Sequence, residues 1–182
     1  MHNANPVSGV VRVAMVAVAL LLTGCGQAET ATAKPATKAE PKTATDWFMI
    51  GLGGKTLRMQ VAVRPQELER GLMERRDLGK DDAMVFVFER PQPMSFWMRN
   101  TPTPLDIAYF TPEGQLAEYY PAYPFDEKSL PSRSQRLQFV VETNQGWFGA
   151  NAIKPGARLD LKALSAALTA RGFDPRKYGL EP

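Results

Sequence analysis

The sequence predicts an α+β domain of mainly antiparallel strands, folded as a compact, small barrel-like sheet with one or two short helices. Three observations lead to this prediction. The composition becomes aromatic and β-branched from Asp46 onward, short apolar runs follow one another at close spacing, and stretches containing Pro, Gly or Asp separate them. Residues 46–182 are enough for a single domain and too few for two comfortable ones.

The elements that follow residue 46 begin with a strand and a short helix. Every second position of residues 56–63 is apolar, as in a half-buried strand: Leu57, Met59, Val61 and Val63. The glycines within residues 51–55 supply the turn before this strand. Pro65 at a first helical position, with Leu68 and Leu72 one turn apart, predicts a short helix.

The rest of the domain is expected to consist of strands and one closing helix. Further strands are predicted at residues 84–88, 94–99, 105–110, 116–120, 137–142 and 158–161. Leu161, Leu164 and Leu168 then line one face of a C-terminal helix that ends near Gly172.

Residues 1–24 have the pattern of an export signal. A leader with one positive charge, Arg12, precedes an unbroken apolar run over residues 13–22, and small residues follow. This run is too short to cross a bilayer, for which a helix needs roughly 20 residues. The adjoining Leu-Thr-Gly-Cys resembles the lipobox of bacterial lipoproteins, which implies that Cys25 is acylated and becomes the mature N-terminus.

Acylation of Cys25 predicts a lipid-anchored protein of the cell envelope, because several acyl chains together hold a protein firmly at a membrane. Gly26 in place of Asp favours the outer membrane, facing the periplasm, if the cell is Gram-negative. Cys25 is also the only cysteine, so no intramolecular disulfide is possible. Residues 26–45 lack aromatic and large aliphatic side chains, which predicts a disordered tether between the lipidated cysteine and the domain.

The composition also limits which partners, catalytic mechanisms and metal sites this protein can have. The net charge is +3, or +2 without Arg12, which is too small to indicate a nucleic-acid-binding protein. His2 is the only histidine and lies in the predicted signal, so the mature chain would lack both imidazole and a free thiol. This excludes Ser-His and Cys-His nucleophile pairs and the usual zinc ligand sets. No phosphate-binding glycine loop is present, and we expect no cofactor and no metal.

Several short blocks carry a resemblance to a known family. They are Arg70–Arg75 (RGLMER), Met84–Phe88 (MVFVF), Met94–Thr101 (MSFWMRNT), Pro104–Ile107 (PLDI), Val141-Glu142 with Gly146, and Ile153–Gly156 (IKPG). Together, over roughly residues 55–161, they resemble the bacterial and archaeal domain-of-unknown-function family 192. Many members of that family are exported or lipid-anchored. The resemblance implies a fold and no reaction, because the family has no assigned activity.

Four polar residues of these blocks form a candidate site: Arg99, Asn100, Asp106 and Glu142. If the strands ending at Arg99 and beginning at Leu105 form a hairpin, Arg99 and Asp106 face each other as a cross-strand pair. They would then line a groove under Trp97, with Asn100 and Glu142 nearby. The alternative is a structural ion pair at the hairpin end, contributing at most about 1 kcal/mol.

Aromatic and sulfur-containing side chains offer two further hypotheses. Trp97 is a candidate for stacking on sugar rings, together with Tyr119, Tyr120, Tyr123 and Trp147, and core packing is the alternative for these aromatics. Four methionines carry thioethers that bind soft Cu(I), and core filling is their alternative: Met73, Met84, Met94 and Met98.

Two classes of function remain open. The first is a non-catalytic accessory or ligand-binding lipoprotein, whose partners are the membrane and a small molecule or an envelope polymer. The second is a carboxylate-dependent hydrolase or lyase acting on an envelope polymer, with Asp106 and Glu142 as its acid/base pair. The lack of histidine favours the first. A single cleft with the two carboxyls about 5–10 Å apart, as in glycosidases, would favour the second.

Overall fold

The computed structural model describes residues 40–181, which belong to one compact unit. The predicted signal peptide, the lipid-attachment residue Cys25 and most of the predicted tether lie outside the described residues. Their assignment therefore stays a prediction from the sequence.

The last residues of the predicted tether are described, and they contact the domain. The backbone amide of Lys42 donates to the carbonyl of Ala170 at 2.8 Å, and the side chain of Gln60 donates to the carbonyl of Thr45 at 2.9 Å. The chain is thus hydrogen-bonded to the domain a few residues before the composition changes at Asp46.

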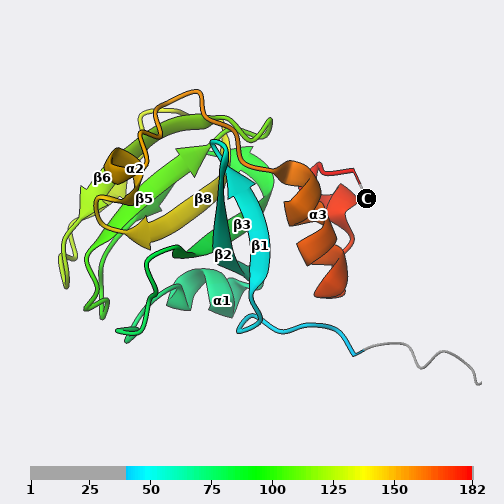
Figure 1. Cartoon of the computed structure of the whole chain (residues 1–182), viewed down its shortest axis with the longest axis horizontal. Coiled ribbons are helices and arrows are strands. Elements are labelled where there is room, and N and C mark those ends of the chain that lie inside the picture. Colours follow the sequence, from blue (N-terminus) through cyan, green and yellow to red (C-terminus); the bar gives the residue numbers. More distant parts are fainter. Residues whose placement is uncertain (1–39, 182) are drawn as a thin grey trace, which may run out of the picture. The chain divides into compact units, whose positions relative to one another are not determined.

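Six strands form the main sheet: β1 (Phe48–Leu52), β2 (Lys55–Ala62), β3 (Asp82–Gln92), β5 (Leu105–Phe110), β6 (Leu116–Ala122) and β8 (Leu137–Asn144). Their spatial order is β1-β2-β3-β8-β5-β6 (Figure 1). Only β2 and β3 are parallel neighbours, and helix α1 (Pro65–Arg70) lies in the crossover that such a pair requires. The predicted α+β class with mainly antiparallel strands is confirmed, although the sheet is not closed into a barrel.

A short segment, residues 157–160, hydrogen-bonds to both edges of this sheet. The carbonyl of Ala157 accepts from Leu116 of β6 at 2.8 Å, and the carbonyl of Arg158 accepts from Gly53, directly after β1, at 2.9 Å. The strand predicted here is therefore wrong, because the segment forms only isolated bridges before the next helix begins. It satisfies backbone groups at one end of both edge strands.

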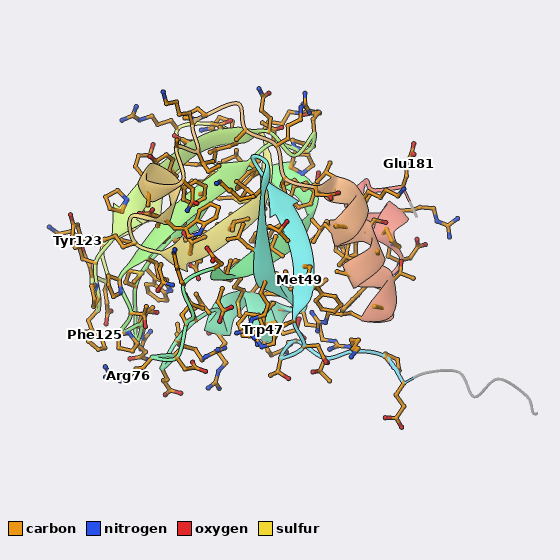
Figure 2. The ribbon with its side chains drawn as sticks, viewed as in Figure 1. Trp47, Met49, Arg76, Tyr123, Phe125 and Glu181 are labelled. Carbon is orange, nitrogen blue, oxygen red and sulfur yellow. The ribbon has the colours of Figure 1, made fainter. Side chains whose placement is uncertain are left out.

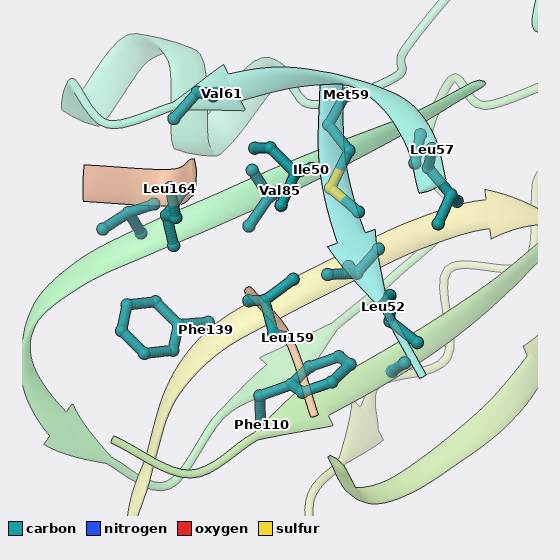
Figure 3. Close-up of a cluster of buried hydrophobic side chains, with 14 of the residues drawn as sticks. Ile50, Leu52, Leu57, Met59, Val61, Val85, Phe110, Phe139, Leu159 and Leu164 are labelled. Carbon is teal, nitrogen blue, oxygen red and sulfur yellow. The ribbon is translucent and has the colours of Figure 1, made fainter. Parts of the chain in front are cut away.

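Apolar side chains cover both faces of the sheet. One cluster, between the sheet and helix α3 (Leu161–Ala170), includes Ile50, Leu52, Leu57, Met59, Val61, Val85, Phe110, Phe139, Leu159 and Leu164 (Figure 3). A second cluster includes Met84, Phe86, Met94, Met98, Leu105, Ile107, Tyr109 and Val140. Along β3, β5 and β8 successive residues alternate between the two clusters, because side chains alternate across a strand. Register therefore decides which face each polar side chain reaches.

Both predicted helices are confirmed. Helix α1 begins at Pro65, where the missing amide is harmless. Helix α3 follows Asp160, whose carboxylate accepts from the amide of Ala163 at 2.9 Å as an N-cap. The structure adds the short helix α2 (Trp147–Ala150), a 3-10 turn η1 (Pro175–Tyr178) and strand β1, which the sequence patterns did not indicate. Within residues 40–181, no helix combines the length and the apolar character needed to cross a membrane.

Candidate ligand-binding pocket

The hairpin predicted between Arg99 and Asp106 does not form. Strand β4 contains only Ser95–Phe96 and pairs with β7 (Leu130–Pro131), so the strand predicted over residues 94–99 is wrong in most of its length. Strand β5 is central in the sheet, and both of its edges are already occupied by β6 and β8. Arg99 lies instead on an exposed turn with its guanidinium 5.4 Å from the centre of the Trp97 ring.

Asn100 shapes that exposed turn. Its φ of +52° lies in the left-handed region, which asparagine tolerates better than most residues. Its carbonyl accepts from the amide of Glu74 at 2.8 Å and so joins the turn to the segment after α1. Asn100 therefore has a clear backbone role next to the pocket described below.

Asp106 is buried on the face of the sheet that carries the first cluster. It pairs with Thr143 across to β8, and its carboxylate accepts from the amide of Gly146 at 2.9 Å. Burial raises the pKa of Asp106, and hydrogen bonds from the backbone of Phe148 and Gly146 partly offset that effect. The carboxylate thus holds the turn that leads into α2, which is a structural role.

Glu142 occupies the opposite face. Its partners in the sheet are Met84 of β3 and Ile107 of β5, both members of the second cluster. Only 5% of the residue is exposed, and no described residue forms a hydrogen bond or ion pair with its carboxyl. Burial raises the pKa of Glu142 to about 8. The sheet therefore separates Asp106 from Glu142, and the single cleft that an acid/base pair would need does not exist.

The carboxyl of Glu142 borders a cavity of about 280 Å³ between α1 and the second face of the sheet. The lining residues come from α1 and the turn after it, from β3 and from the β4 region: Leu68, Glu69, Arg70, Gly71, Leu72, Met73, Phe86, Phe88, Ser95, Phe96, Trp97 and Thr101, with Glu142 of β8. Trp97 and Glu142, both predicted from the sequence, meet here. Arg99 and Asn100 line a neighbouring hollow, to which Trp97 also contributes.

Aromatic rings form much of the wall around Glu142. The rings of Phe86 and Phe96 meet edge to face with centroids 5.1 Å apart, and Phe96 also contacts Tyr109 at 6.0 Å. Trp97 is 44% exposed and lines the cavity. The predicted stacking role of Trp97 therefore stays open.

The other aromatics and the methionines mostly have packing roles. Tyr119 stacks on Phe148 with centroids 4.8 Å apart, and the indole N–H of Trp147 donates to Asp81 at 3.0 Å. Tyr123 and Phe125 project from the loop after β6 (Figure 2). Of the four methionines considered above, three are buried in the second cluster and only Met73 lines the cavity. Among residues 40–181, no group of three or more His, Cys, Asp or Glu side chains is placed to hold a metal ion.

Gly71 keeps the cavity open. Its φ of +46° and ψ of −128° suit glycine alone, and a Cβ at this position would lie 3.0 Å from Cζ of Phe86 and 3.7 Å from Oε2 of Glu142. A side chain here would therefore strain the backbone and fill the space beside the carboxyl.

We expect Gly71→Ala to lower the free energy of unfolding by about 1–3 kcal/mol, because it combines backbone strain with a steric contact. Denaturant unfolding measures this loss. Gly54→Ala is the matched control, since Gly54 also has positive φ but has open space where a Cβ would lie. Equal losses in the two variants would show that the contact with Phe86 is unimportant.

Comparison with known proteins identifies the family of this domain and two similar structures. Residues 49–161 match the family described as DUF192, uncharacterized ACR. The chain belongs to this family. No curated protein matches the chain. The DUF192 domain is similar to two crystal structures with a TM-score of 0.60 and 31% identity in each case.

The first of these structures is a candidate transcription regulator from Sinorhizobium meliloti 1021, for which the match covers 65% of this chain and 95% of the other. The second is a protein of unknown function from Novosphingobium aromaticivorans, with 66% and 92% covered. The DUF192 assignment thus confirms the resemblance seen in the sequence blocks, and it assigns no activity.

The sequence blocks of the DUF192 domain have distinct structural roles. The block around Trp97 supplies four wall residues of the cavity, Ser95, Phe96, Trp97 and Thr101, while Met98 enters the core. The Arg-Gly-Leu-Met block supplies Gly71. Sequence reasoning missed this wall, because the predicted helix included Leu72 and so placed Gly71 inside it, whereas α1 ends at Arg70 and the chain turns at Gly71.

Proposed function

We propose that this protein is a non-catalytic ligand-binding module of the cell envelope, attached to a membrane through lipid on Cys25, and that the cavity beside Glu142 is its binding site. The observation that carries the proposal is the buried carboxyl of Glu142, which has no partner among the described residues. Among the described residues, the only fully buried side-chain atom without a hydrogen-bond partner is Nε of Arg171, so the Glu142 oxygens are accessible from the cavity. A ligand in the cavity would supply the hydrogen bond or ion pair that this carboxyl lacks.

The arrangement favours binding over catalysis. A hydrolase or lyase that uses Asp106 and Glu142 together is disfavoured, because the two carboxyls lie on opposite faces of the sheet. Glu69 is the other carboxylate of the cavity wall, and it is solvent-exposed. Most of the remaining wall is aromatic or aliphatic, as is usual for small-molecule sites.

Mass spectrometry of small molecules that co-purify with the full-length, membrane-anchored protein tests the site. We expect Glu142→Gln to lose the bound species and Asp106→Asn to keep it. Asp106→Asn is a matched control, because it changes an equally buried carboxyl on the opposite face of the same sheet. Identical bound species in the wild type and in Glu142→Gln would remove this cavity as the binding site.

The anchor is tested separately. We expect Cys25→Ser to move the protein from the membrane fraction to the soluble fraction of the producing cells, because the acylated thiol is lost. Immunoblotting of the two fractions measures the shift. Unchanged membrane association of Cys25→Ser would refute the lipid anchor and leave the cavity proposal in place.

A further inference from the structure

We infer that the ligand of this cavity carries an organic cation, a primary or quaternary ammonium group, which ion-pairs with Glu142 between the rings of Phe86, Phe96 and Trp97. This inference rests on the proposed binding function and names the chemical class of the ligand. Three properties of the cavity wall support it: its charge, its aromatic surface and its size.

The charge of the wall is the first argument. Its ionisable side chains are Glu142, Glu69 and Arg70, and Arg70 is engaged elsewhere, since its guanidinium donates to Glu74 at 3.1 Å and is largely exposed. From β5, the Tyr109 hydroxyl on the same face donates to a backbone carbonyl at 2.7 Å. No described cation therefore pairs with Glu142, and an anionic ligand would gain no ion pair from Glu142 and would be repelled by Glu69.

The aromatic wall is the second argument. Ammonium groups are attracted to the faces of aromatic rings within about 6 Å, and this attraction strengthens where water is excluded. Phe86 and Phe96 are packed against each other and line the cavity with the carboxyl, and the partly exposed Trp97 lines it as well. Trp97 already has one cation over its ring, the guanidinium of Arg99 at 5.4 Å from the ring centroid. A buried carboxylate among aromatic rings is the combination that recognises alkylammonium ions.

The size of the cavity is the third argument. A volume of about 280 Å³ lies just below the range for small-molecule sites, roughly 300–1,000 Å³. It therefore suits a small amine, or the ammonium end of a longer molecule whose remainder lies outside.

Cation binding changes the protonation of Glu142. In the free protein burial keeps the carboxyl protonated at neutral pH, with a pKa of about 8. An ammonium ion favours the carboxylate, so binding releases one proton from Glu142 to the solvent and leaves the ligand cationic. A neutral sugar or alcohol would instead use the protonated carboxyl as a hydrogen-bond donor and would release no proton.

Titration calorimetry of the full-length protein in detergent, with matched probes, distinguishes these cases. The cations are tetramethylammonium, choline and phenylethylamine, and the neutral probe is 3,3-dimethylbutan-1-ol, which has the shape of choline without its charge. We expect cation affinity to rise by roughly 50- to 100-fold between pH 6 and pH 9, in step with the ionised fraction of Glu142. At pH 7, titrations in buffers of different ionisation enthalpy should report close to one proton released.

Two variants sharpen the test. Glu142→Gln should abolish both the cation binding and the proton release, whereas Asp106→Asn should leave both unchanged because Asp106 lies on the other face. If 3,3-dimethylbutan-1-ol binds as tightly as choline and this binding depends on Glu142, the cation inference is wrong while the cavity remains a binding site. If no cation binds at either pH, the inference is also overturned. Absence of any Glu142-dependent co-purifying species would remove the proposed function as well.

Discussion

Replacing Arg171 with methionine should lower the free energy of unfolding by about 3–5 kcal/mol. Arg171 is only 2% exposed, and its guanidinium forms two hydrogen bonds with the carboxylate of Glu67, at 2.7 and 3.1 Å. It also donates to the carbonyl of Val61. Methionine fills similar space without a charge, so the variant leaves Glu67 partly buried with only the largely exposed Arg64, at 3.1 Å, as a cation.

The pKa of Glu67 indicates how strongly this carboxylate depends on its partners. Burial acts to raise that pKa, but hydrogen bonds from Arg171 and from the backbone of Arg64 and Val63 prevail and lower it to about 2. A carboxyl whose pKa is lower in the folded than in the unfolded state stabilises the fold above its unfolded pKa. That contribution is lost as the pH falls from about 4.5 towards 2, and Arg171→Met should weaken this acid dependence.

Urea unfolding at pH 7 measures the effect of Arg171→Met. Arg136→Met is the control, because Arg136 pairs with Glu113 at 3.0 Å on the surface, where both side chains are more than half exposed. It should cost at most about 1 kcal/mol. The double variant Glu67→Gln, Arg171→Met should recover part of the loss, since no charge is then left buried. A loss for Arg171→Met no larger than that for Arg136→Met would contradict this account.

The same ion pair connects the end of the chain to the candidate pocket. Arg171 follows helix α3, beyond the part of the chain that matches the family. Glu67 lies in α1, whose last three residues, 68–70, line the cavity. Leu164 and Leu168 of α3 complete the first apolar cluster. The end of the C-terminal helix is thus joined through this ion pair to the element that forms part of the cavity wall.

Local patterns in the sequence were enough to predict most elements. The alternation at Leu57, Met59 and Val61 reports a strand with one face in the core, and the structure confirms it as β2. Pro65 located the start of α1 because a proline is harmless at that position. These signals are local, so no knowledge of the other strands was needed.

The candidate site depends on long-range pairing, which such patterns do not contain. The residues between Arg99 and Leu105 look like a hairpin loop, yet β5 pairs with β6 and β8, which lie further along the chain. The register Ile107 to Glu142 then places Glu142 on one face and Asp106 on the other. A shift by one residue would reverse these faces. Burial of Glu142 also needs the turn at Gly71, which belongs to another part of the sequence.

The wild type should become less stable as the pH rises from 5 to 8, and Glu142→Gln should not show this decrease. The pKa of Glu142 is about 8 in the folded protein and near 4.5 when unfolded, so between these values the folded state binds more protons. Stability therefore falls with increasing pH over this interval, and it levels off above pH 8, where both states are ionised. From pH 5 to pH 8 the expected loss is about 3–4 kcal/mol, which is large compared with the 5–15 kcal/mol of a typical domain.

Urea unfolding of both proteins at several pH values checks this prediction. No histidine occurs in residues 40–181, so no imidazole of this region contributes to the slope between pH 5 and pH 8. Glu69→Gln is the control, because Glu69 lines the same cavity but is exposed and should keep the wild-type slope. Parallel loss of stability in wild type and Glu142→Gln would mean that the carboxyl finds a partner or water in solution.

The same carboxyl links this instability to ligand binding. A cation that pairs with ionised Glu142 binds the folded state alone, so it stabilises the protein, and more so at higher pH. The thermal shift caused by choline should therefore increase from pH 6 to pH 9, while the free protein becomes less stable over that range. A neutral ligand that needs the protonated carboxyl would show the reverse trend. The sign of this dependence separates the two ligand classes without any knowledge of the natural ligand.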